Sequence, residues 1–202
     1  MTDLSHDRRK DDGIRHTVAL GENLAEPLEL VQLSLNSTAM ARERFPGYRF
    51  TRLVGARLEL EDADMKHMSH IIGVDLWRPL SGVARPFEYQ LRHMINRFEL
   101  SALFGDDGHG LYHHAIRPKG YDFQRDEVHP TGMEHWRADY REMTDVRQMI
   151  AASIVWLYRA GKDNVWLRRV PCTWHAADAI VTLKATDALD DWARLYAFYP
   201  GW

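Results

Sequence analysis

At residues 149–158 the chain reads MIAASIVWLY, an almost wholly apolar run that contains one polar residue, Ser153. A helix that is apolar on all sides belongs in the interior of a globular protein, because it has no face for water. We therefore expect the most buried helix here, capped by Thr144 and ended by Gly161. The run has only half of the roughly 20 residues that a bilayer span needs, so we expect no membrane helix.

Amphipathic spacing predicts further helices along the chain. In each segment apolar residues recur at helical intervals, between residues that cap or break a helix. These segments are Glu61–Ile72, Pro86–Phe104, Met133–Met143, Thr173–Lys184 and Asp187–Phe198. Residues 27–40 are ambiguous, because their leucines nearly alternate while Pro27 suits the first turn of a helix.

Short strands are predicted in three places. Apolar and polar residues alternate over residues 48–60, a pattern that is typical of a half-buried strand. Leu111–Arg117 and Tyr121–Val128, joined by residues 118–120, predict a hairpin. Asn164–Val170 predicts one more strand. Because strands and helices do not alternate regularly along the chain, the pattern favours an α+β fold over a doubly wound sheet.

The composition is that of a globular protein. The chain has 202 residues, a formal net charge of −3 and 45% hydrophobic residues. We expect a single compact domain of about five helices packed with short, mostly antiparallel strands, over residues 17–202. Residues 1–16 are polar and charged, which predicts a flexible arm.

Several functional classes are excluded or disfavoured. The near-neutral charge excludes a histone-like binder, and the single cysteine, Cys172, excludes an internal disulfide. The first residues lack a secretory pattern, so we expect a cytoplasmic protein. The phosphate loop, the dinucleotide fingerprint, the hydrolase elbow and the common zinc motifs are absent. We therefore favour a non-enzymatic binding or assembly protein.

Arginine supplies the candidate binding surface. The chain has 21 arginines and 5 lysines, and several arginines alternate with aromatic residues. Guanidinium groups bind phosphates and aromatic rings stack on bases, so a protein or nucleoprotein partner is expected, with RNA or DNA contact through a local patch. The candidate residues are Arg42, Arg44, Arg49, Arg57, Arg168, Trp166 and Trp202. The alternatives are a solvated strand face and, for the aromatic end of the chain, packing on the core.

Histidine supplies a second candidate site. The chain has 11 histidines, and those near residues 106–135 lie among carboxylates. Imidazole and carboxylate groups bind zinc or manganese, so this segment predicts a metal-dependent hydrolase or nuclease as the alternative function. The candidate ligands are His109, His113, His129, His135 and Asp107. No other cofactor is expected; scattered surface histidines and a pH-responsive regulator are the remaining interpretations.

Overall fold

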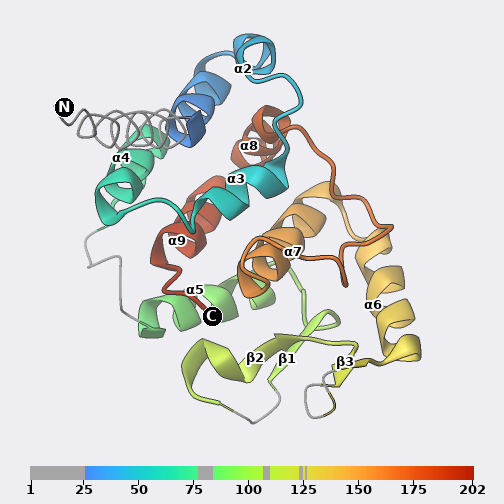
Figure 1. The fold of residues 1–202 in the computed structure, drawn as a ribbon. Helices are drawn as coiled ribbons and strands as arrows, with labels where there is room; N and C mark the ends of the chain where they lie inside the picture. The colour runs from blue at the N-terminus through green and yellow to red at the C-terminus, as the bar shows by residue number, and fades with distance from the viewer. Residues whose placement is uncertain (1–25, 77–83, 107–109, 123–124, 126) are drawn as a thin grey trace, which may run out of the picture.

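The computed structural model describes residues 26–76, 84–106, 110–122, 125 and 127–202. These residues form an α+β fold in which helices predominate (Figure 1). One cluster of buried apolar side chains extends from Leu30 to Tyr199, so segments distant in sequence share one core. The predicted arm, residues 1–16, lies outside the described residues.

Helix α7 (Asp145–Tyr158) confirms the prediction made from the apolar run. Nearly all of its residues from Gln148 to Leu157 are buried, and Thr144 is its N-cap. The one polar residue of the run is satisfied, because the Ser153 hydroxyl donates to the Met149 carbonyl and accepts the indole N–H of Trp192. The buried Ser153 hydroxyl therefore has both an acceptor and a donor as hydrogen-bond partners.

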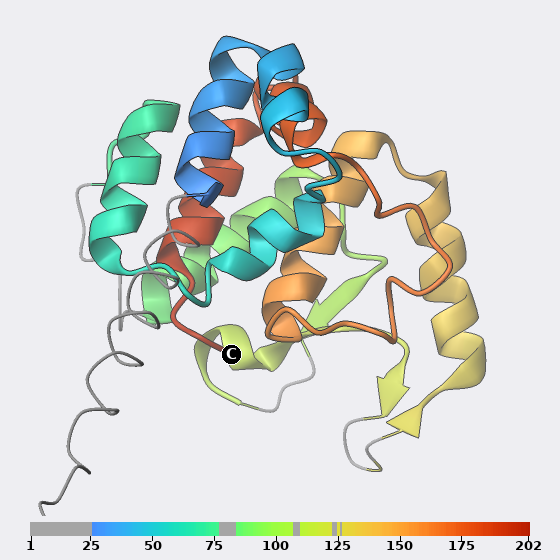
Figure 2. The same ribbon diagram turned by 45° about the horizontal axis from the view of Figure 1, so that its top comes forward.

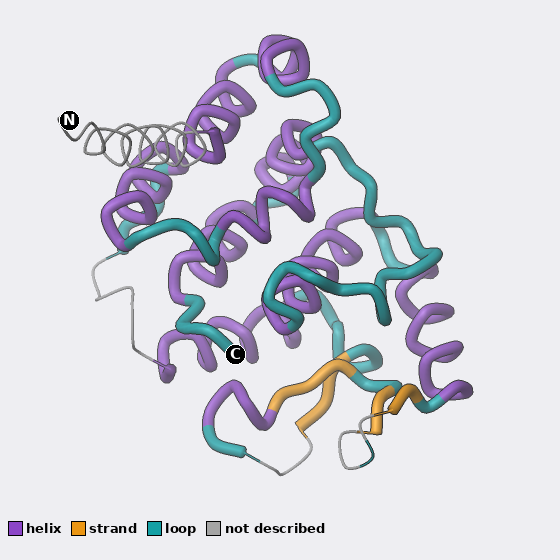
Figure 3. Tube along the Cα trace, viewed as in Figure 1, coloured by secondary structure: helices purple, strands orange, loops and turns teal. Residues whose placement is uncertain are grey.

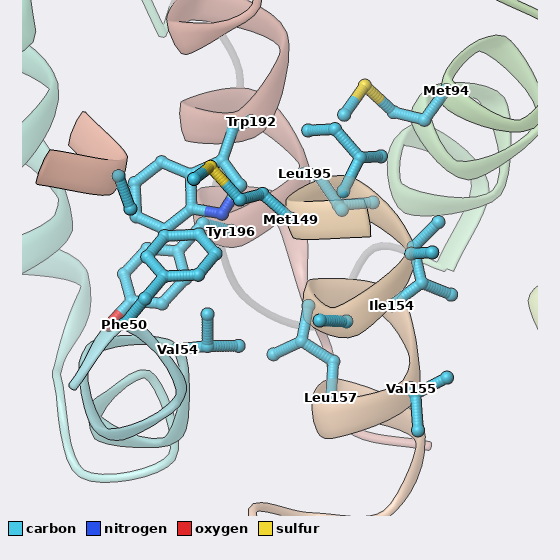
Figure 4. Packing of buried hydrophobic residues seen from close by; sticks show 14 of the residues in the cluster. Phe50, Val54, Met94, Met149, Ile154, Val155, Leu157, Trp192, Leu195 and Tyr196 are labelled. Carbon is cyan, nitrogen blue, oxygen red and sulfur yellow. The ribbon is translucent and has the colours of Figure 1, made fainter. Parts of the chain in front are cut away.

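Three more helices build the centre of the molecule. Helices α3 (Phe50–Ala56) and α8 (Ala176–Ala185) contact α7, and α9 (Leu189–Phe198) contacts α8. Figure 4 shows the rings of Phe50, Trp192 and Tyr196 gathered beside Val54 and Met149. The Trp192 and Tyr196 rings are stacked with centroids 4.9 Å apart. Aromatic rings therefore supply much of the apolar area that holds these helices together.

The remaining helices surround this centre. They are the helix over residues 26–36, α2 (Thr38–Arg44), α4 (Asp62–Ile72), α5 (Ala84–Arg97), the 3-10 helix η1 (Tyr112–Ala115) and α6 (Pro130–Glu142). Figures 1 and 2 both place α4 and α6 on opposite sides of the centre. Helix α4 ends as predicted and begins one residue later, with Glu61 as its N-cap, and the ambiguous residues 27–40 are helical except at Ser37.

The strands are short and lie together at one edge of the molecule, as Figure 3 shows in orange. Strand β1 (Phe104–Asp106) pairs antiparallel with β2 (Ile116–Pro118), and β3 (Tyr121–Asp122) pairs with β4 (Glu127–Val128). The predicted hairpin is therefore wrong in its pairing. Residues 112–115 of the first half form η1 and residues 116–117 pair with β1, whereas the second half folds back on itself as β3 and β4.

Two other strand predictions are wrong. Residues 50–56 of the segment 48–60 form helix α3, because Phe50, Leu53 and Val54 also fit a helical spacing and bury one face. Residues 164–170 form no strand; they lie in a loop between α7 and α8. Among the described helices, none is long and apolar enough to cross a membrane.

Candidate functional site

Most arginines in the described residues serve the fold. Seven of them donate hydrogen bonds to backbone carbonyl oxygens: Arg57, Arg97, Arg117, Arg137, Arg141, Arg147 and Arg194. Carbonyl groups at helix ends and in loops lack partners within regular structure, and guanidinium groups satisfy them. The high arginine content is therefore explained in part by the many short helices of this fold.

Two of the predicted binding residues are engaged in ion pairs between helices. Arg42 of α2 donates to Asp178 of α8 at 2.6 Å. Arg44 donates to Glu29 in the preceding helix at 3.3 Å. Both arginines are exposed, but each already has a carboxylate partner that competes with a ligand.

Arg57 lies in the interior and is not part of an exposed surface. Its side chain is 7% exposed. Its guanidinium donates to the carbonyl oxygens of Tyr196, Ala197 and Tyr199 at 2.8–3.3 Å, where α9 ends. Burial lowers the pKa of Arg57. The surface predicted for Arg57 is corrected to a structural role at the end of α9.

The two predicted tryptophans are also packed inside. The Trp166 ring is fully buried, and its N–H donates to the Lys119 carbonyl at 2.8 Å. The Trp202 ring lies edge-on to Phe87 and Tyr158, with centroids 5.7 and 4.8 Å away. Trp166 offers no free face for stacking, and the partly buried Trp202 is engaged in ring contacts with the core.

Among the described arginines, Arg49, Arg168 and Arg169 are exposed and have side chains without a hydrogen bond, an ion pair or a ring contact. Arg49 precedes α3, far in sequence from the other two. Of the predicted surface, only Arg49 and Arg168 therefore keep a free guanidinium group, and they belong to two different segments.

Arg168 lies in a loop that is held at both of its ends. The Asp163 carboxylate accepts the backbone N–H groups of Val165, Trp166 and Leu167 at 2.8–3.2 Å. From α6, Arg137 donates to the Val165 carbonyl, and Arg141 donates to the Arg169 carbonyl at 3.0 Å. This network fixes the backbone that carries Arg168 and Arg169.

We call Arg137, Arg141, Arg168 and Arg169 the arginine cluster. Burial, followed by the charges of the other three members, lowers the pKa of Arg137, while Asp163 opposes this. The other three positive charges are thus close enough to Arg137 to disfavour its charged form. Arg169 has a φ of 63°, a left-handed conformation that costs a non-glycine residue about 1 kcal/mol. Positive charge and a strained backbone conformation are therefore combined where α6 meets this loop.

Sequence reasoning identified Arg168 but missed Arg137 and Arg141 as its neighbours. The two α6 arginines are four residues apart and lie on one side of that helix. Their spacing was visible in the sequence. Their approach to a loop more than twenty residues away depends on the packing of α6 beside residues 165–169, which no local pattern encodes.

The predicted metal ligands are not brought together among the described residues. His113 is buried, and its Nε2 atom lies 3.0 Å from the Gly201 carbonyl oxygen. His129 caps α6 by accepting the Gly132 N–H. His135 is exposed on α6. Within the described part of the chain, no three His, Cys, Asp or Glu side chains are placed to hold a metal ion. Asp107 and His109 lie outside it, so the metal site stays a prediction.

The arginine cluster offers hydrogen-bond donors and positive charge. A guanidinium group binds a phosphate or carboxylate through two parallel hydrogen bonds, so the cluster is equipped to hold an anion. Comparison with protein-family models, curated proteins and solved structures finds no match to this chain.

Proposed function

We propose that this chain is a non-enzymatic binding or assembly protein that contacts the phosphate backbone of a nucleoprotein partner through the arginine cluster. The observation that carries the proposal is the pair of free guanidinium groups, Arg168 and Arg169, beside the two that are fixed on the loop carbonyls. The cluster contributes only cations, which bind but do not supply a general base.

Phosphate is the preferred ligand because of the local charge balance. Asp163 is the one carboxylate that affects the pKa of Arg137, and its oxygens already accept three backbone N–H groups. Three arginines thus act against one carboxylate at Arg137. A chain of phosphates supplies several negative charges that offset these positive charges.

The contact is expected to be independent of base sequence. Trp166, the aromatic residue nearest to the free arginines in sequence, is buried and has no free face. Contacts with phosphate oxygens position a protein on a nucleic acid but do not read its bases. Two free arginines also give only weak binding, so protein contacts must supply the remaining affinity of such an assembly.

The test is fluorescence anisotropy with a labelled DNA duplex of about 20 base pairs and an RNA duplex of the same length, over a series of salt concentrations. Two neutralised phosphates predict a slope of about −2 in the logarithm of the binding constant against that of salt. Arg168→Ala/Arg169→Ala is expected to remove the binding and its salt dependence. Both side chains are exposed and unpaired, so the fold should tolerate this variant within about 0.5 kcal/mol.

Arg42→Ala/Arg44→Ala is the matched control. It removes two exposed arginines that already have carboxylate partners, and binding is expected to stay within about twofold of the unchanged protein. Equal losses in the two double variants would show that any positive charge suffices. Unchanged binding in Arg168→Ala/Arg169→Ala would overturn the proposal.

A further inference from the structure

A cleft of about 660 Å³ lies beside α3, separate in its lining residues from the arginine cluster. One wall is α3 together with Gly47, Tyr48 and Arg49, and the other is the turn of residues 160–162 that follows α7. Clefts of this volume are typical of small-molecule sites. The free Arg49 therefore lines an open cleft, whereas Arg168 lies on an exposed loop outside it.

The charged side chains that line the cleft have a net positive charge. Arg52 is neutralised by Glu26 at 2.8 Å, and its guanidinium lies 4.5 Å from the centre of the Tyr48 ring. Arg49 and Lys162 make no side-chain hydrogen bond or ion pair among the described residues, and Glu59 is one opposing carboxylate on the lining. Two free cations against one free anion favour a ligand with a negative group.

The floor of the cleft is built by glycines beside an indole ring. A Cβ atom added at Gly55 would lie 3.0 Å from Nε1 of Trp156 and 4.0 Å from Cα of Gly161. The Trp156 Nε1 atom is buried and has no hydrogen-bond acceptor in the described structure. The absence of a side chain at Gly55 therefore lets the edge of the indole ring pack directly against this part of α3, and both residues line the cleft.

An apolar surface also faces this space. Leu58 lines the cleft and is 46% exposed, and Trp156 is only partly buried. Apolar atoms that stay exposed inside a concave site gain free energy when a ligand removes them from water. The lining thus combines two cations with an apolar floor.

We propose that the cleft binds a small organic anion, with its carboxylate or phosphate group held by Arg49 and Lys162 and its flat apolar body on Gly55, Leu58 and Trp156. Guanidinium and ammonium groups recognise the oxygen atoms of either anion. The apolar body replaces water over the indole ring and the leucine. This site is independent of the nucleic-acid contact, because the two sites share no residue.

The test is a titration followed by the indole N–H signals in ¹H–¹⁵N NMR spectra, with the Trp156 signal assigned from Trp156→Phe. Benzoate and phenyl phosphate are the probes; they carry the same ring with a carboxylate or a phosphate. Benzyl alcohol lacks the charge, and inorganic phosphate lacks the ring. We expect a saturable shift of the Trp156 signal with benzoate or phenyl phosphate, and at least about tenfold weaker binding of the two controls.

Arg49→Ala/Lys162→Ala is expected to weaken binding of the anionic probe at least about tenfold, because both charges are removed. Arg42→Ala/Arg44→Ala is the matched control, since it removes two exposed arginines that do not line the cleft, and it should bind the probe unchanged. Gly55→Val is a second variant: its Cβ would lie 3.0 Å from Nε1 of Trp156 and displace the ring on which the probe packs, so it is expected to prevent binding. The proposal fails if neither anion gives a saturable shift, if Arg49→Ala/Lys162→Ala binds as before, or if benzyl alcohol binds equally well.

Discussion

The imidazole ring of His113 lies edge-on to the indole ring of Trp202, with centroids 5.5 Å apart and planes at 90°. The Nε2 atom of His113 is 3.0 Å from the Gly201 carbonyl oxygen. Phe87 contacts both rings, so α5, η1 and residues 201–202 meet in one aromatic group. The aromatic end of the chain is therefore packed on the core, as one of the two sequence interpretations expects.

Trp202→Ala is expected to lower the free energy of unfolding by about 2–4 kcal/mol, because a large ring leaves its contacts with Phe87, His113 and Tyr158. The measurement is urea unfolding followed by circular dichroism. Leu111→Ala is the control, since Leu111 is 74% exposed and its loss should change stability by less than about 0.5 kcal/mol. Equal midpoints for Trp202→Ala and the unchanged protein would contradict the packing described here.

Protonation of His113 makes the free energy of unfolding depend on pH, and the direction of its shifted pKa fixes the sign of that dependence. Burial, and then the neighbouring His114, lower the pKa of His113, while the Gly201 carbonyl and Glu88 oppose this. The unfolded chain takes up the proton near pH 6.5, more readily than the folded chain. The stabilising effect of neutral His113 is therefore complete above about pH 6.5 and decreases as the pH falls below it.

The measurement is the free energy of unfolding of the unchanged protein and of His113→Gln over this pH range. The unchanged protein should lose up to about 1.4 kcal/mol per pH unit more than the variant, until the folded histidine itself takes up a proton. Other titrating groups affect both proteins alike, so the difference between the two curves reports His113. Parallel curves would exclude this role.

Arg57→Met is expected to destabilise the protein by about 2–4 kcal/mol, because the carbonyl oxygens at the end of α9 lose a charged donor in the interior. Urea unfolding measures the change. Arg44→Met is the matched control, since it removes an exposed ion pair worth about 0–1 kcal/mol. A smaller effect at Arg57 than at Arg44 would show that water replaces the guanidinium at these carbonyls.

The sequence predicted those helices for which several local signals indicate the same structure. Helix α7 was predicted from its apolar run, and α4 from its amphipathic spacing and the glycine that ends it. Helix α3 was mistaken for a strand because a seven-residue segment with buried Phe50, Leu53 and Val54 satisfies both periods in part. Only the packing of α3 against α7 and α8 decides between the two conformations.

The functional residues were predictable only as residue types. Arginine was identified as the important side chain, but its role depends on which group lies opposite. Arg57 meets backbone carbonyls of α9, Arg42 meets Asp178, and Arg168 meets no partner among the described residues. These partners are separated from the arginines by long stretches of chain, so the tertiary fold alone distinguishes a structural arginine from a free one.

Gly120, the residue before β3, lies against the first turn of α6. It has a φ of 85°, and an added Cβ would lie 3.0 Å from the carbonyl carbon of Gly132 and the nitrogen of Met133. Both are backbone atoms, which cannot rotate away as a side chain does. Gly47 has a similar φ of 73° but nothing within 4 Å of an added Cβ. A comparison of alanine substitutions at the two glycines therefore distinguishes the cost of backbone strain from the cost of steric overlap.

Gly47→Ala is expected to cost about 1 kcal/mol, the strain of a left-handed alanine. Gly120→Ala carries the same strain and also forces β3 away from α6, so its cost should reach about 3 kcal/mol or more. Thermal unfolding of the two variants measures the difference. The separation should also break the hydrogen bond from His129 N–H to the Gly120 carbonyl, which faster amide exchange at His129 would report. Equal costs for the two variants would mean that β3 and α6 separate freely.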